Sequence, residues 1–143
     1  MTLLHGSCQC GGVAFEISGP LLGAAHCHCT KCRKQTGAAF RTRARVAKAH
    51  FRVVRGEALI RFYESSPDFH RGFCSRCGSP VYNHNGPNSW AGRNVPVSLD
   101  SVGIALGSLD EDPGVAPAFH GFVADKAVWF SFCDGLPQHK GWP

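Results

Sequence analysis

The grouping of the cysteines constrains this chain more than any other feature of its sequence. Eight cysteines occur in 143 residues, and seven of them fall into three short groups. The groups are Cys8-x-Cys10, Cys27-x-Cys29-x-x-Cys32 and Cys74-x-x-Cys77. Cysteines at such spacings are typical of metal ligands or of a disulfide framework, and the cellular compartment decides between the two.

The start of the chain favours metal ligation. It has no basic segment followed by a long apolar stretch, and no run of about 18 uncharged apolar residues occurs anywhere. We therefore expect a soluble, cytoplasmic protein without membrane association. Because the cytosol keeps ordinary thiols reduced, the cysteines are expected to bind metal rather than form disulfides.

Length and composition indicate one ordered domain over residues 1–143. Hydrophobic residues make up 43% and charged residues 17%, which is typical of a globular chain. The formal net charge of +5 favours an acidic partner. No block of five like charges occurs, so charge does not distinguish a nucleic acid from a small anionic substrate.

Period-two patterns of apolar residues predict a mainly β fold with antiparallel sheets. Val13–Ile17 is one predicted strand, and Phe51–Val54 and Ala58–Tyr63 are predicted to form a hairpin around Gly56. Further strands are predicted at Val102–Leu106, Gly121–Ala124 and Val128–Phe132.

Helices are expected to be few and short. Thr30–Thr36 is the better candidate and Ala44–Ala49 the weaker one, and neither is long enough to be stable alone. Asn83–Pro96 is rich in Gly, Pro and Asn and is predicted to be one long loop bordering a cleft.

Cys8, Cys10, Cys74 and Cys77 are predicted to form a closed structural zinc site. Four thiolates suit tetrahedral zinc, and the glycine that follows each pair allows the tight turn that directs both sulfurs inward. Joining pairs more than sixty positions apart would constrain a small β domain strongly. The alternative is that either pair is simply buried thiols.

Cys27, Cys29 and Cys32 form a different arrangement, because no second pair remains to complete a tetrahedron. Three protein ligands with one open position is the general pattern of catalytic zinc. The alternatives are a structural site completed by His26, His28 or Cys133, or a reactive thiol cluster without metal. Cys133 follows a predicted aromatic strand, and we expect a small buried side chain outside both sites.

The chemistry of three thiolates favours a thiol substrate. A zinc complex with three thiolates is net negative and only modestly Lewis acidic, so it suits activation of an incoming thiol better than formation of hydroxide. Nearby basic side chains could receive substrate carboxylates, although such residues are most often solvated surface. They are Lys31, Arg33, Lys34, Arg41, Arg43 and Arg45.

Histidine and tryptophan residues supply weaker candidates. His26 and His28 alternate with ligand cysteines, so their side chains are expected to point away from the metal or to tune it through hydrogen bonds. His120 and Trp129 could line a pocket, but core packing explains such residues more often.

Several motifs in a fixed order resemble the glutathione-dependent formaldehyde-activating enzyme (GFA) family over nearly the whole chain. They are Cys8-x-Cys10-Gly11, Cys27-His28-Cys29-x-x-Cys32-Arg33-Lys34, Gly37-Ala-Ala-Phe40, Gly56-Glu57, Ser65-Ser66-Pro67, Phe73-Cys74-x-x-Cys77-Gly78-Ser79-Pro80, and Trp129 with Asp134-Gly135-Leu136-Pro137.

The resemblance implies β-sheets built around zinc, a fold called the β-tent, with two zinc ions. Cys8, Cys10, Cys74 and Cys77 match the structural zinc ligands, and Cys27, Cys29 and Cys32 match the ligands of the catalytic zinc. The implied activity is that of a carbon-sulfur lyase, which interconverts S-hydroxymethylglutathione with glutathione and formaldehyde. The implied partners are therefore a small thiol, such as glutathione, and a small aldehyde.

Two other functions stay open at this point. One is a non-enzymatic zinc module that contacts protein or nucleic acid, although no basic stripe interleaved with stacking aromatics supports nucleic acid. The other is a redox-responsive protein whose Cys27 cluster is free of metal and oxidisable, which requires a lowered thiol pKa and exposure.

Overall fold

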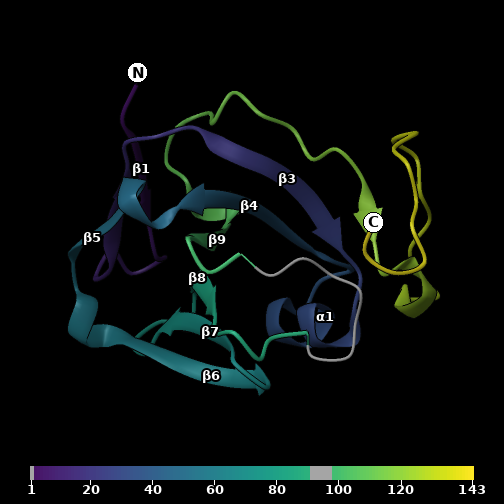
Figure 1. Cartoon of the computed structure of the whole chain (residues 1–143), viewed down its shortest axis with the longest axis horizontal. Coiled ribbons are helices and arrows are strands. Elements are labelled where there is room, and N and C mark those ends of the chain that lie inside the picture. The colour runs from purple at the N-terminus through teal and green to yellow at the C-terminus, as the bar shows by residue number, and fades with distance from the viewer. Residues whose placement is uncertain (1, 91–97) are drawn as a thin grey trace.

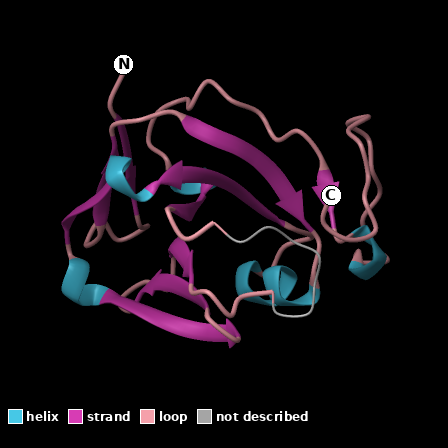
Figure 2. Cartoon of the chain, viewed as in Figure 1, coloured by secondary structure: helices cyan, strands magenta, loops and turns pink. Residues whose placement is uncertain are grey.

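The computed structural model describes residues 2–90 and 98–143, which form mainly β-strands (Figures 1 and 2). The strands are β1 Leu4–Ser7, β2 Ala14–Ile17, β3 Leu21–Cys27, β4 Arg41–Ala47, β5 Phe51–Arg55, β6 Ile60–Ser66, β7 Phe69–Cys74, β8 Pro80–Asn85, β9 Ser101–Ala105 and β10 His120–Gly121. The helices are α1 Thr30–Thr36 and the 3₁₀ turns η1 Lys48–His50, η2 Glu57–Leu59, η3 Leu106–Ser108 and η4 Val123–Asp125.

Two sheets make up the architecture. The smaller has the order β1-β2-β5, and the larger has the order β10-β3-β4-β9-β8-β7-β6. Neighbouring strands are antiparallel except for β10, which runs parallel to β3. The predicted mainly β, antiparallel fold is therefore confirmed.

The core joins both sheets. Phe15 and Ile17 of the small sheet, with Val13 just before β2, are almost fully buried, as their alternation predicts. They share one apolar cluster with Val46 and Ile104 of the large sheet. Burying one such side chain contributes roughly 1.5–3 kcal/mol. This contact fixes the small sheet, which carries the first cysteine pair on the turn between β1 and β2, against the large one.

The predicted hairpin around Gly56 is wrong. β5 pairs with β2, whereas β6 pairs with β7 in the other sheet. Gly56 adopts a left-handed conformation with φ of 76°, and a Cβ there would lie 1.9 Å from the carbonyl oxygen of Gly12. This close approach and the following turn η2 redirect the chain from one sheet to the other instead of closing a hairpin.

The helix predicted at Ala44–Ala49 is also wrong. Most of the segment belongs to β4, where Ala44 and Val46 are fully buried at alternate positions and pair with β9. Burial of these side chains against the neighbouring strand outweighs the helix propensity of the segment.

The C-terminal strands are shorter than predicted. β10 covers only His120–Gly121, and Val123–Asp125 forms η4. No strand forms at Val128–Phe132, where Val128 is 97% exposed.

The remaining predicted elements are either confirmed or lie partly outside the residues that the structure describes. α1 and β9 agree with the predicted helix at Thr30–Thr36 and the strand at Val102–Leu106. The predicted loop Asn83–Pro96 begins inside β8, and its residues 91–97 lie outside the described residues. Within the described part of the chain, no helix has the length and hydropathy of a membrane span.

Candidate metal centres and their cleft

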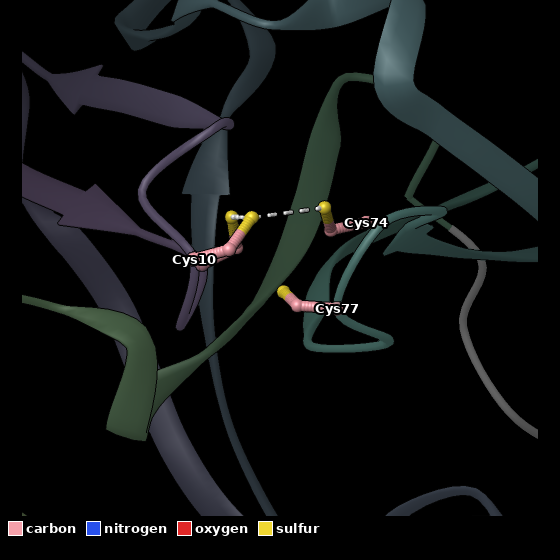
Figure 3. A group of neighbouring side chains, drawn as sticks. Cys10, Cys74 and Cys77 are labelled. Carbon is pink, nitrogen blue, oxygen red and sulfur yellow. Dashed lines mark hydrogen bonds between the residues drawn. The ribbon is translucent and has the colours of Figure 1, made fainter.

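The turns at the ends of the two sheets bring Cys8, Cys10, Cys74 and Cys77 together, and their sulfur atoms all lie within 4.8 Å of one another. The Cys8 and Cys10 sulfurs are 3.5 Å apart, and those of Cys10 and Cys74 are 3.8 Å apart. Figure 3 shows Cys10, Cys74 and Cys77 directing their sulfurs toward one another. Tetrahedral zinc with Zn–S bonds of about 2.3 Å requires sulfurs about 3.8 Å apart, so this set fits zinc.

Local hydrogen bonds favour the thiolate form of two of these cysteines, Cys8 and Cys77, whose pKa values are lowered. The backbone N–H of Val13 donates to Cys8 Sγ at 3.2 Å, and Ser79 Oγ lies 3.2 Å from Cys77 Sγ. The Ser79 hydroxyl, together with its backbone N–H, lowers the pKa of Cys77 to about 5. Gly78 has φ of 79°, the left-handed conformation expected of the tight turn after the pair.

The second cysteine set lies where β3 passes into α1. Cys27 ends β3, Cys29 is the N-cap of α1, and Cys32 lies in the first turn of the helix. The Cys29 sulfur accepts the backbone N–H of Cys32 at 3.3 Å, which fixes the cap and both side chains. The three sulfurs lie within 4.8 Å of one another, and Cys27 and Cys32 are buried while Cys29 is partly exposed.

The three thiols cannot all ionise at once without a cation. Hydrogen bonds from Cys27 and Cys29 lower the pKa of Cys32 far below its ordinary value. Interactions with Cys29 and Cys32, added to burial, raise the pKa of Cys27 strongly. Buried negative charges side by side repel one another, so one thiolate forms at the expense of its neighbours. A divalent cation would remove this conflict, and the donor set therefore fits zinc.

Arg71 of β7 is hydrogen-bonded to this set. Its Nη1 donates to Cys32 Sγ at 3.4 Å and to Gln35 Oε1 at 2.8 Å, while its Nε donates to Ser65 Oγ at 2.8 Å. Arg71 is only 6% exposed. Its positive charge compensates part of the negative charge that three thiolates carry. The net negative charge of the site is therefore smaller than the cysteines alone would give.

Strand β4 adds a row of arginines on the face that carries Cys27. Arg41 pairs with Cys27 across the β3–β4 register, and Arg43 and Arg45 follow at alternate positions. Arg41 is 3% exposed, and burial lowers its pKa to about 10, so it stays charged at neutral pH. Its Nη2 donates to Asn83 Oδ1 at 2.7 Å, whereas its Nε is buried and has no hydrogen-bond partner among the described residues.

The three sulfurs border a small chamber that adjoins a larger cleft. The chamber has a volume of about 30 Å³ and is lined by the three cysteines with Arg41, Arg43 and Arg71. The cleft has a volume of about 410 Å³ and includes Cys29, Lys31 and Arg71 in its lining. Cys29 and Arg71 line both spaces, so a ligand in the cleft lies beside the Cys29 side chain.

Aromatic rings form one wall of the chamber. Trp90 and Phe122 are stacked with ring centroids 5.7 Å apart at 7°, and Trp142 lies 5.8 Å from Phe122. Trp90 and Phe122 have φ of 62° and 55°, a conformation that costs bulky residues energy. A strained backbone of this kind persists only where the surrounding packing holds it in place. In this protein the strained conformation of Trp90 and Phe122 places both rings against the chamber.

The histidine predictions are partly confirmed. His28 is fully buried among phenylalanines, and its Nε2 lies 2.7 Å from Nδ1 of His120. Burial lowers the pKa of His28 to about 4. Among the described residues, no histidine shares a ligand group with Cys27, Cys29 and Cys32, so His26 and His28 do not complete that set.

Two other predictions are wrong. Trp129 is 69% exposed and lines none of the spaces described above, because Val128–Phe132 forms no strand that would bury it. Cys133 is exposed rather than buried for the same reason, although it lies outside both cysteine groups as expected.

Sequence reasoning missed Arg71 and the aromatic wall. Arg71 alternates with Phe69 along β7, and both are buried, so a charge at an inward position of a strand was the available signal. The pairing of Trp90 with Phe122 joins distant segments, and no local pattern predicts it.

The fold and the two cysteine centres define a mainly β protein whose thiol groups are compatible with two zinc ions. Residues 3–125 match the family model for the glutathione-dependent formaldehyde-activating enzyme, and the chain belongs to this family. The expectation drawn from the resemblance is thus confirmed at the level of the family.

One curated relative and one solved structure add detail. A Halomonas elongata protein named "Putative glutathione-dependent formaldehyde-activating enzyme" is 34% identical over 86 residues, which is 56% of this chain. The match spans about half of the relative's length, 55%. A crystal structure of a Rhodobacter sphaeroides protein has a TM-score of 0.57 at 24% identity, covering 79% of this chain and 91% of the other, and supports the fold alone.

Proposed function

We propose that residues 1–143 form a single β-tent domain that acts as a zinc-dependent carbon-sulfur lyase in the cytoplasm. Its substrates would be a small anionic thiol such as glutathione and a small aldehyde such as formaldehyde. The observation that carries the proposal is that the Cys27, Cys29 and Cys32 set borders a chamber lined by arginines, and that this chamber adjoins a larger cleft. Family membership supports the same activity.

The two cysteine groups have different parts in this proposal. Cys8, Cys10, Cys74 and Cys77 would hold a structural zinc that joins the two sheets. Cys27, Cys29 and Cys32 would hold the catalytic zinc, which when bound supplies an open position that stabilises a substrate sulfur as the thiolate.

The chain's own residues would bind and orient the substrate. Arg41 and Arg43 face the chamber, and Lys31 borders the adjoining cleft, so a thiol with carboxylates can be held at both ends. Arg71 keeps Cys32 in place and offsets thiolate charge. The rings of Trp90 and Phe122 limit water around the reacting atoms, which favours adduct formation over competing hydration.

The proposal is tested by following S-hydroxymethylglutathione formation from glutathione and formaldehyde by NMR exchange. The parent is compared with a Cys27→Ser, Cys29→Ser, Cys32→Ser variant, and a Cys133→Ser variant is the control because Cys133 is exposed and outside both groups. We expect acceleration by the parent and the control but not by the triple variant.

Zinc analysis of the same dialysed proteins completes the test. The folded triple variant should contain one zinc ion fewer than the parent. Equal zinc content in both, or equal rates in all three proteins, would exclude the proposed catalytic centre.

A further inference from the structure

A third group of metal-ligating side chains lies on the opposite face of β3 from Cys27. His26 and His120 pair across the β3–β10 register, so their side chains leave the sheet on one side, whereas Cys27 leaves on the other. The ligand atoms of His26, His120 and Asp134 all lie within 4.8 Å of one another, the same limit that the two cysteine groups meet. Figure 1 shows the C-terminal segment beside β10, at the end of β3.

Hydrogen bonds fix the ring nitrogens that are turned away from this group. His120 is fully buried, and its Nδ1 lies 2.7 Å from His28 Nε2, which leaves His120 Nε2 facing Asp134 Oδ2 at 2.8 Å. His26 Nδ1 lies 2.8 Å from Thr42 Oγ1, which leaves Nε2 for a ligand role. Metal-binding histidines usually have their second nitrogen anchored in this way.

The carboxylate is anchored as well and still reaches solvent. Asp134 Oδ1 accepts the backbone N–H of Leu136 at 3.0 Å, and its side chain is 39% exposed. Metal ligands about 2.1 Å from an ion lie at most about 4.2 Å apart, so a small rotation of Asp134 or of the half-buried His26 would bring the group to coordination distance. Solvent exposure gives an ion a route of entry.

We propose that His26, His120 and Asp134 form a third metal site, for a divalent transition-metal ion that accepts imidazole and carboxylate ligands. Two histidines and one carboxylate leave further positions for water, which is the ligand pattern of open zinc or iron(II) sites. Without an ion, His120 Nε2–H donates to Asp134. With an ion, both rings of the His28–His120 pair reverse their tautomers: Nδ1–H of His120 donates to His28 Nε2, and His28 carries its own proton on Nδ1, so no net proton is lost. This state leaves the His28 Nδ1–H buried without a hydrogen-bond partner among the described residues, which lowers the affinity of the site.

Asp134 lies beyond residue 125, where the family match ends. The segment that supplies it also contributes Phe130 and Phe132, whose rings pack around His28 and His120. The proposed site is therefore built by the C-terminal segment together with β3 and β10, and it is separate from both cysteine groups.

The test titrates zinc into protein whose cysteine sites are already loaded, with binding followed by calorimetry. We expect one further zinc ion per chain and a shift of the His120 Nε2 resonance in long-range ¹H–¹⁵N NMR spectra. Asp134→Asn and His26→Gln should each weaken this binding at least about ten-fold. Two controls should leave it unchanged: Glu111→Gln removes the carboxylate of another histidine–acid pair, and His84→Gln removes one of two stacked histidines.

The outcomes separate this inference from the proposed function. The third site is overturned if no further zinc ion binds, or if His26→Gln binds zinc as tightly as the parent. If Asp134→Asn does not fold, the result for His26→Gln alone is used to judge the site. The Cys27→Ser, Cys29→Ser, Cys32→Ser variant should keep the third ion. This variant therefore tests the catalytic centre, whereas the His26→Gln and Asp134→Asn variants test the third site.

Discussion

The contact between Gly121 and Trp142 tests how the C-terminal segment packs against the chamber. A Cβ atom added at Gly121 would lie 2.5 Å from Trp142 Cε3 and 2.7 Å from Cζ3. Carbon atoms pack at roughly 3.5–4.0 Å, so the indole must move by about 1 Å. Overpacking of this kind typically costs 1–3 kcal/mol, and we predict that Gly121→Ala lowers the free energy of unfolding by about this amount.

The assay is a double-mutant cycle with denaturant unfolding in zinc-containing buffer. In a Trp142→Ala background the space is open, so the same Gly121→Ala change should cost less than about 0.5 kcal/mol. Gly107→Ala is the matched control, because its backbone is not left-handed and, among the described residues other than its chain neighbours, no atom lies within 4 Å of the added Cβ. An equal cost of Gly121→Ala in both backgrounds would refute the packing argument.

Three further predictions concern the metal centres and one surface pair. Cys77→Ser should remove one zinc ion and lower the melting temperature, whereas Cys133→Ser should change neither, as measured by elemental analysis and calorimetry. Arg71→Met should raise KM for the thiol roughly ten-fold or more, because it removes the positive charge that offsets the thiolates of Cys27, Cys29 and Cys32, and an interaction with a charged group contributes about 1.5–3 kcal/mol. Arg71→Lys should restore part of the binding, and unchanged steady-state constants would contradict this role. The hydrogen bond to Glu111 raises the pKa of His5 above 6.5, and the backbone N–H of His5 helps to lower that of Glu111 below 4.5. The stability that this pair contributes should therefore be fully present between pH 4.5 and 6.5. It should be lost as the pH rises through the raised pKa of His5 or falls through the lowered pKa of Glu111. It should be absent from Glu111→Gln, and NMR titration of His5 in both proteins would check this.

The cysteine groups were predictable because metal ligation is local chemistry. Close pairs such as Cys74-x-x-Cys77 on glycine turns restrict the chain to few uses, and the structure places them beside Cys8 and Cys10. Strand β2 was predictable for a similar reason, because alternation at Val13, Phe15 and Ile17 reports one buried face directly.

The path of the chain between sheets was not predictable in the same way. The residues around Gly56 suit a hairpin, but the close approach of Gly12, more than forty positions away, and the turn η2 direct β6 to the other sheet. Arg71 reaches Cys32 through pairing between distant strands, and the stacking of Trp90 on Phe122 depends on tertiary packing alone. Such contacts have no signature in a local window of sequence.

The central claim is that Cys27, Cys29 and Cys32 hold an ion with an open position for a thiol. It is tested most directly by the visible absorption of the cobalt(II)-substituted protein, in which thiolate ligands give intense charge-transfer bands. We predict that adding glutathione strengthens and shifts these bands in the parent but not in the Cys27→Ser, Cys29→Ser, Cys32→Ser variant. Spectra that are identical with and without glutathione in the parent would contradict the account.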